Sequence, residues 1–164
     1  MIPAIALPAL ALGIGFVAGL RSLTAPAAVS WAARLGWLNL HDTPLAFMGS
    51  TAAVVIFSLL ALAEYLVDLR PETPSRTAAG PLLARLALGG LAGACLCASA
   101  GRSLALGAGL GAAGGLIGAF AGYEARTRLV RALAVKDRVI GLSEDVVAIV
   151  LAWLVVGLAR AAAG

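Results

Sequence analysis

Long stretches without a charged side chain most constrain how this chain folds. Four of them hold 16 to 21 uncharged residues each, at Ile2–Leu20, Thr43–Ala63, Leu86–Gly101 and Ser103–Tyr123. As α-helices they reach about 24–32 Å, which matches the roughly 30 Å hydrocarbon core of a bilayer. The mean hydropathy of +1.01 and the 62% of hydrophobic residues do not suit a water-soluble globule. We therefore predict an all-α integral membrane protein.

A fifth apolar stretch, Val146–Ala159, holds only 14 uncharged residues. As a helix it reaches about 21 Å, so a full crossing must include Glu144, Asp145 or Arg160. We predict a single transmembrane domain over residues 1–164, built as a compact bundle of about five transmembrane helices. The predicted spans lie near residues 2–20, 43–66, 82–101, 103–123 and 143–161.

Two segments between the spans are partly apolar and carry basic residues. Residues 24–38 contain two tryptophans and one arginine, and residues 126–138 are more basic. Each is typical of a short helix that lies at the membrane interface or re-enters the membrane. The sequence leaves these two placements open.

Lysines and arginines divide unevenly when five spans alternate across the bilayer. Eight fall in the second and fourth connections: Arg70, Arg76, Arg85, Arg126, Arg128, Arg131, Lys136 and Arg138. Four fall on the opposite side: Arg21, Arg34, Arg102 and Arg160. The positive-inside rule then predicts a cytoplasmic N-terminus and an external C-terminus. Because the basic residues sit between apolar runs, we expect contacts with membrane lipids and no nucleic-acid partner.

Glycines recur at four-residue spacing in several spans. The fourth span carries two such rows, Gly107–Gly111–Gly115 and Gly114–Gly118–Gly122, and shorter pairs occur at Gly15 and Gly19 and at Gly89 and Gly93. Strips without side chains let neighbouring helices approach closely. Packing within one bundle is the simpler interpretation, and an interface between copies in a homo-oligomer is the alternative.

A weak internal similarity appears when the chain is shifted by 103 positions. The shift pairs Gly15 with Gly118, Thr24 with Thr127 and Asp42 with Asp145. Three spans separate the paired elements, so the two copies are expected to run in opposite directions through the bilayer. Inverted repeats of this kind are frequent in transporters. The sequence thus suggests a possible inverted repeat.

Four carboxylates lie at the ends of predicted spans and are candidate binding residues: Glu64, Asp68, Glu144 and Asp145. Charges near hydrocarbon are costly, so each one needs a partner or a use. Ion pairing with the basic connections is one interpretation. The other is a cation or proton site.

Two segments, RSLTAP at residues 21–26 and SRTAAGP at residues 75–81, combine arginine, serine, threonine and proline. Free amides at a helix start, aided by a guanidinium, can hold an anion. The candidate residues are Arg21, Ser22, Thr24, Ser75, Arg76 and Thr77. The predicted topology places the two segments at opposite membrane faces. Cys95 and Cys97 point to different helix faces and His41 is the only histidine, so we expect no metal site and no cofactor.

The motifs GLRSLTAPAAVSW, TPSRTAAGPLLAR, GYEARTRL and GLSEDVVAIV resemble a bacterial membrane family catalogued as domain of unknown function 4126. The resemblance extends from about Gly19 to Val150 and implies a small multi-span protein of the bacterial inner membrane. The positions that match its motifs are Arg21, Ser22, Thr24, Pro26, Ser75, Arg76, Thr77, Glu144 and Asp145. The resemblance carries no activity.

Taken together, these features favour a transporter or channel for a small solute or ion. The alternative is a non-catalytic structural or lipid-binding module that oligomerises through its glycine faces. Lipid-modifying enzymes usually show a denser Asp or His motif than Glu144 and Asp145 provide, so we expect no enzymatic activity.

Overall fold

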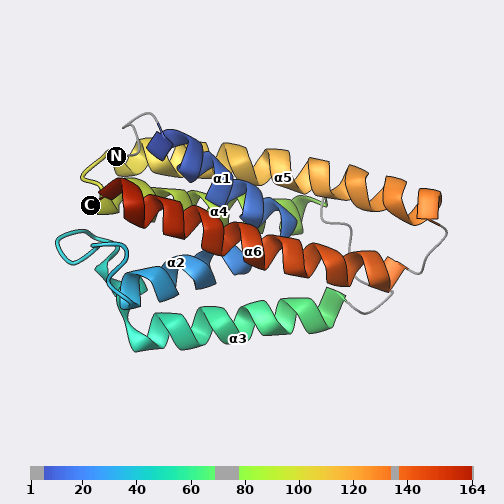
Figure 1. Cartoon of the computed structure of the whole chain (residues 1–164), viewed down its shortest axis with the longest axis horizontal. Coiled ribbons are helices and arrows are strands. Elements are labelled where there is room, and N and C mark those ends of the chain that lie inside the picture. The colour runs from blue at the N-terminus through green and yellow to red at the C-terminus, as the bar shows by residue number, and fades with distance from the viewer. Residues whose placement is uncertain (1–5, 69–77, 134–136, 164) are drawn as a thin grey trace.

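The computed structural model describes residues 6–68, 78–133 and 137–163. Its elements are α1 (Ala6–Leu20), α2 (Thr24–Arg34), the short 3-10 helix η1 (Ala46–Gly49), α3 (Thr51–Asp68), α4 (Ala79–Ser99), α5 (Leu104–Leu133) and α6 (Asp137–Ala163). The helices lie side by side along one long axis (Figure 1). Helices α3, α4, α5 and α6 are long and apolar enough to cross a membrane, and α1 is a shorter apolar helix. The predicted all-α membrane bundle is confirmed.

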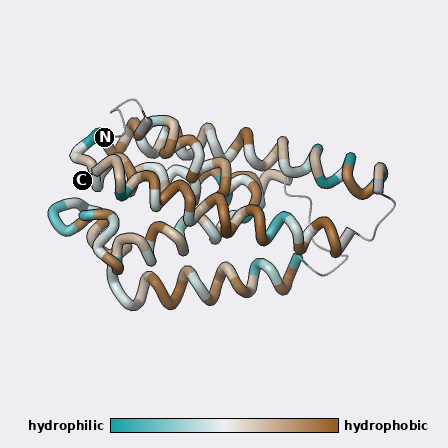
Figure 2. Tube along the Cα trace, viewed as in Figure 1, coloured by the Kyte–Doolittle hydropathy of each residue, from teal (hydrophilic) through white to brown (hydrophobic). Residues whose placement is uncertain are grey.

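Apolar residues follow the middle of the helices (Figure 2). Hydrophilic residues gather in the connection between α2 and α3 and toward the ends of α3 and α5 (Figure 2). This division suits a bundle whose middle faces hydrocarbon and whose ends face water.

Helix α2 lies inside the bundle, where it packs against α1, α3, α4 and α6. Seven of its eleven residues are buried, including Ala25, Ala28 and Ala32 on one face. It runs antiparallel to α3, because Thr24 meets Tyr65 at one end of the pair and Trp31 meets Ser58 further along. The small face of α2 fits between larger helices. For residues 24–34, which the sequence left open between an interfacial and a re-entering placement, the structure shows a helix packed inside the bundle.

The start of α1 and the end of α6 lie at the same end of the bundle (Figure 1). Helices α1 and α6 are antiparallel, since Gly13 faces Val155 and Arg21 faces Gly141. The expectation that the termini lie on opposite membrane faces is wrong, because α2 adds one more passage along the bundle. We call the two ends the Arg21 end and the terminal end.

Backbone packs directly on backbone where α1, α4 and α5 meet. A Cβ added at Gly111 would overlap the carbonyl oxygen of Gly89, and one added at Gly15 would overlap the carbonyl oxygen of Gly111. A Cβ at Gly19 would lie 2.5 Å from the carbonyl oxygen of Gly115. Only a hydrogen at these positions permits such a short separation between helices.

The same contacts bear on the suggested repeat. Gly15 and Gly19 of α1 meet Gly111 and Gly115 of α5 in the same order, so the two helices run in the same direction. An inverted relation between them is therefore excluded. The shift also pairs Thr24, which begins α2, with Thr127, which lies inside α5.

Helices α5 and α6 are longer than the sequence indicated. Residues 126–133 continue α5 as one 30-residue helix instead of forming a separate interfacial segment. Helix α6 begins at Asp137 and contains 27 residues, so Glu144 and Asp145 lie about two turns inside it. The early start supplies the length that the 14-residue apolar run lacks.

Candidate functional site

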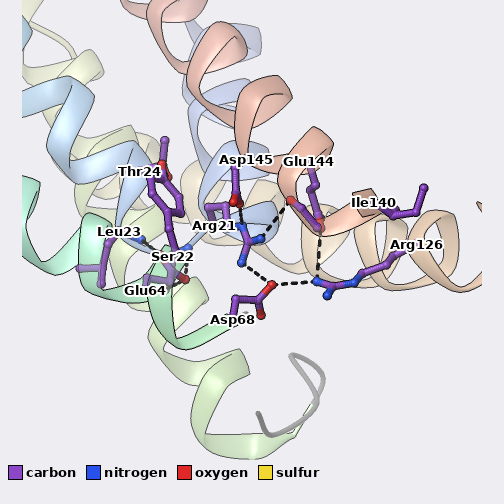
Figure 3. A network of polar contacts seen from close by, with 12 residues as sticks. Arg21, Ser22, Leu23, Thr24, Glu64, Asp68, Arg126, Ile140, Glu144 and Asp145 are labelled. Carbon is purple, nitrogen blue, oxygen red and sulfur yellow. Dashed lines mark hydrogen bonds and ion pairs between the residues drawn. The ribbon is translucent and has the colours of Figure 1, made fainter. Parts of the chain in front are cut away.

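Arg21 occupies the turn between α1 and α2 and is only 1% exposed. Its Nη1 lies 2.8 Å from Oδ2 of Asp68, the last residue of α3. Its Nε lies 2.5 Å from Oδ1 of Asp145 in α6. These two atoms form an ion pair, but their geometry is not that of a hydrogen bond. Its Nη2 donates to the carbonyl oxygen of Gly141 at 3.4 Å. One guanidinium therefore joins the end of α1 to both α3 and α6 (Figure 3).

A second guanidinium, that of Arg126 in α5, meets the same carboxylate. Its Nη1 lies 2.8 Å from Oδ2 of Asp68 and 3.8 Å from Oε2 of Glu144. The longer distance is a contact between charges and not a hydrogen bond between these two atoms. We call Arg21, Asp68, Arg126, Glu144 and Asp145 the charge cluster.

The charge cluster contains two guanidinium groups and three carboxylates, so its formal charge is −1 when all five are ionised. Burial disfavours the charged form of Arg21, but the adjacent Asp68 and Asp145 carboxylates outweigh burial and raise the pKa of Arg21. Arg21 therefore remains a cation. Removing one partner from such a buried group leaves an uncompensated charge, which is strongly destabilising.

Glu64 lies beside the charge cluster and is held by different groups. Its Oε1 accepts hydrogen bonds from the Ser22 amide at 2.9 Å and the Ser22 hydroxyl at 2.6 Å, and its Oε2 accepts one from the Leu23 amide at 2.9 Å. These amides precede α2, where the sequence predicts an anion. The anion at this helix start is a carboxylate of the chain itself, which accepts hydrogen bonds from the two amides just before the first turn of α2.

A polar seam between α2 and α3 leads toward the charge cluster. The hydroxyls of Thr24 and Tyr65 lie 2.6 Å apart, and the Tyr65 ring centroid is 5.8 Å from Cζ of Arg21. Further along, Nε1 of Trp31 donates to Oγ of Ser58 at 3.1 Å. These four residues of α2 and α3 line a cleft of about 190 Å³, which α6 closes on the other side.

A second hollow, which we call the lateral groove, lies among α1, α5 and α6 and has a volume of about 310 Å³. Apolar side chains and the small residues of α5 form most of its lining. Arg126, Ser143 and Glu144 are its polar lining residues. The groove therefore shares two residues with the charge cluster.

The predicted candidates fall into three groups. Arg21, Asp68, Glu144 and Asp145 converge in the charge cluster. Ser22 and Thr24, which follow Arg21 in sequence, are hydrogen-bonded to Glu64 and Tyr65 of α3 beside the cluster. Ser75, Arg76 and Thr77 lie outside the described residues.

Of the second arginine-containing segment, which the sequence predicts at the opposite face from the first, the structure describes residues 78–81, and these lie at the Arg21 end. Helix α4 begins at Ala79, just after the second segment's arginine in sequence, and its start lies at the Arg21 end. Nε of Arg85 in α4 donates to the carbonyl oxygen of Gly19 at 3.0 Å, and Arg85 is 7% exposed. The additional passage of α2 brings the start of α4 to the same end as Arg21.

Sequence reasoning did not single out Arg126 or Tyr65 as site residues. Arg126 was counted within a basic connection, although its place in a continuous α5 directs it toward Asp68. Tyr65 follows Ser58 by seven residues, or about two helical turns, and that spacing is the signal for a shared polar face. Within the described ranges, no three His, Cys, Asp or Glu residues are grouped so that they could hold a metal ion.

Comparison with known proteins places almost the whole chain in one family. The family described as "Domain of unknown function (DUF4126)" matches residues 9–163. No curated protein and no solved structure matches the chain. The resemblance carried by the four sequence motifs is thereby confirmed, and the chain belongs to the DUF4126 family.

Proposed function

We propose that this protein carries or conducts a small solute or ion across the membrane, and that the charge cluster takes up a proton during this movement. The observation that carries the proposal is the cluster of five buried or half-buried charged groups where α1, α3, α5 and α6 meet. Ionisable groups inside a membrane bundle are costly and commonly mark ion pathways and proton relays.

The cluster's charges suit a role in coupling. Protonation of Asp145 brings the formal charge of the cluster from −1 to zero and weakens the attraction that holds Arg21. Asp68 ties the end of α3 to Arg21 and Arg126. A change of protonation therefore alters the ion pairs that attach the end of α3 to α1 and α5. Apart from these ion pairs, α3 packs mainly on α2 and η1.

The polar seam between α2 and α3 supports passage of a small solute. Thr51, Ser58 and Tyr65 recur every seven residues on α3 and so share one face. A further cleft of about 360 Å³, lined in part by Arg34 and Thr51, shares Trp31 and Ser58 with the cleft next to Tyr65. The two clefts together extend along the seam from the terminal end toward the charge cluster.

A flux assay in proteoliposomes tests this function. We expect flux above that of empty vesicles for at least one member of a panel of small ions and metabolites, with uptake that changes with an imposed pH gradient. Asp145→Asn and Glu144→Gln are expected to lower this flux because each removes a carboxylate charge from the cluster.

Glu124→Gln is the matched control, since Glu124 pairs with Arg128 on the exposed face of α5, at 55% and 76% side-chain exposure. It is expected to leave the flux unchanged. Absence of flux for the whole panel contradicts the proposal. A real flux that Asp145→Asn and Glu144→Gln lower no more than Glu124→Gln contradicts the role of the cluster.

We propose that the protein lies in a bacterial inner membrane with the Arg21 end facing the cytoplasm. Among the described residues, the turn after α1, the first part of α4 and the last part of α5 belong to that end and carry Arg21, Arg85, Arg126, Arg128 and Arg131. Arg34 at the end of α2, Arg102 after α4 and Arg160 near the end of α6 belong to the terminal end. By the positive-inside rule both termini are then external, so the cytoplasmic N-terminus that the sequence count predicts is reversed. Reporter fusions at both termini test this orientation, and cytoplasmic activity of either fusion contradicts it.

The glycine rows favour transport over the structural alternative. Gly15, Gly89, Gly107 and Gly111 are engaged with other helices of the same chain, so their strips are not presented to a second copy. We propose that the protein is not an enzyme and that assembly, where it occurs, uses other surfaces. A change of oligomeric state without unfolding in Gly111→Leu would favour the alternative.

A further inference from the structure

We propose that the lateral groove binds one acyl chain of a glycerophospholipid whose headgroup carries a phosphate and a primary ammonium. The phosphate then lies beside Arg126 and the ammonium beside Glu144. The inference does not depend on the proposed transport function, because it concerns a membrane-facing hollow between α1, α5 and α6.

The apolar part of the groove runs along α6 from the charged pair toward the middle of the bundle. From Glu144 to Leu151 the helix rises about 10 Å, and half of a roughly 30 Å hydrocarbon core is about 15 Å. The groove volume of about 310 Å³ lies at the lower end of the usual range for ligand pockets. The groove therefore holds the part of one acyl chain that is next to the headgroup.

The walls of the groove suit hydrocarbon and open toward it. Leu20 comes from α1, Ala125 and Leu129 from α5, and Val147 from α6. Leu129 and Val147 are 43% and 49% exposed, so in a membrane their outer surfaces meet lipid. Helix α5 is wrapped closely by α1 and α4, whereas it contacts α6 sparsely, which leaves the hollow between α5 and α6 unfilled by protein.

The polar end of the groove carries charges of both signs. Nη1 of Arg126 and Oε2 of Glu144 lie 3.8 Å apart, and both side chains line the groove. A headgroup with only a negative charge is attracted by Arg126 and repelled by Glu144. A headgroup with a phosphate and an ammonium complements both, and a primary ammonium, unlike a quaternary one, also donates hydrogen bonds to a carboxylate. This charge pattern selects an ethanolamine headgroup over glycerol or choline headgroups.

A lipid competition experiment tests the assignment. The full-length protein is equilibrated with equal amounts of ethanolamine, glycerol and choline phospholipids with identical acyl chains, and retained lipid is measured by native mass spectrometry. We expect the ethanolamine lipid to be enriched several-fold. Glu144→Gln should remove this preference while some lipid remains bound. Equal retention of the three lipids, or enrichment of the glycerol lipid, overturns the headgroup assignment.

A filled groove provides the second arm. Ala125→Phe places a ring in the groove and should lower lipid retention, whereas Ala52→Phe, at an exposed position of α3, should not. Because Ala125→Phe can also disturb folding, the wild-type protein is labelled in parallel with an ethanolamine lipid that carries a photoactivatable acyl chain. Labelling concentrated at Phe16, Val147 and Leu151 supports the site. Val55 and Leu59 of α3 are exposed but do not line the groove. Labelling of these two residues as strong as that of the groove residues overturns the site.

Discussion

Two regions of this bundle are held together by different means. Where α1, α4 and α5 meet, glycines bring helix backbones into direct contact. Where α2 and α3 meet the rest of the bundle, polar and charged side chains make the connections through Glu64, Tyr65 and Asp68. In the most apolar 18-residue stretch of α4, 56% of the residues are buried, against 17% in α3, so α3 depends on few side chains for its position.

The two kinds of contact indicate that the two regions have separate roles, one rigid and one able to move. Backbone contacts tolerate no added atoms and fix α1, α4 and α5 as a scaffold. Ion pairs and hydrogen bonds respond to charge and protonation, so the α3 side of the molecule is the part that can change position. Function is therefore expected to be most sensitive where α3 meets the scaffold.

The largest effect is expected from Arg21→Gln, which breaks the charged connection. The substitution leaves Asp68 and Asp145 without the guanidinium they share, and loss of one partner from a buried ion pair costs about 3–5 kcal/mol. The free energy of unfolding, measured by titration with a denaturing detergent, checks this. Arg34→Gln is the control, since Arg34 is exposed at the other end of α2. Equal losses in the two variants would show that the ion pairs do not hold α3.

Gly111→Ala should have the next largest effect, because the added methyl group would overlap the Gly89 carbonyl. Overpacking costs about 1–3 kcal/mol, and the upper part of that range is expected where backbone is the obstacle. Gly109→Ala on the same helix meets nothing within 4 Å and should not destabilise the protein. Thermal unfolding in detergent separates the two variants, and an unchanged midpoint for Gly111→Ala would show that the scaffold is not packed through glycine.

Glu64→Gln sharpens the comparison by weakening one hydrogen-bonded connection while leaving the charge cluster in place. The amide retains an acceptor for one of the Ser22 and Leu23 amides but loses the negative charge at the start of α2. A loss of about 1–2 kcal/mol in unfolding free energy is expected. Faster hydrogen exchange should be confined to α2 and the end of α3. Faster exchange throughout α5 would argue that the two regions are not separate.

Ser58→Ala should have the smallest effect. It removes the acceptor of the Trp31 indole N–H, and hydrogen bonds between membrane helices contribute about 0.6 kcal/mol on average. A small shift in the unfolding midpoint is therefore expected, together with altered flux if the α2–α3 seam is the path. A shift as large as that of Arg21→Gln would contradict the ranking of these contacts.

The sequence predicted what depends on composition and length. Uncharged runs identified the membrane helices, and charged residues at their ends identified Arg21, Asp68, Glu144 and Asp145 as candidates. The family followed from short motifs and is confirmed by the match over residues 9–163.

What depends on tertiary packing was not predicted. Helix α2 has the composition of an interfacial helix, but its Ala25, Ala28 and Ala32 face is small enough to enter the bundle. That single placement brings the start of α1 and the end of α6 to the same end of the bundle, and the start of α4 to the Arg21 end. Similarly, local pattern indicated an anion at the start of α2, and only the fold shows that Glu64 occupies this position.

A double-mutant cycle on Arg21 and Asp145 tests most directly whether residues from opposite ends of the chain form one buried charge cluster. The unfolding free energies of Arg21→Gln, Asp145→Asn and the double variant are compared with that of the wild type. The double variant should be more stable than the sum of the single losses predicts, by about 1–3 kcal/mol, because contacting residues couple. Additive losses, within about 0.5 kcal/mol, would contradict the cluster.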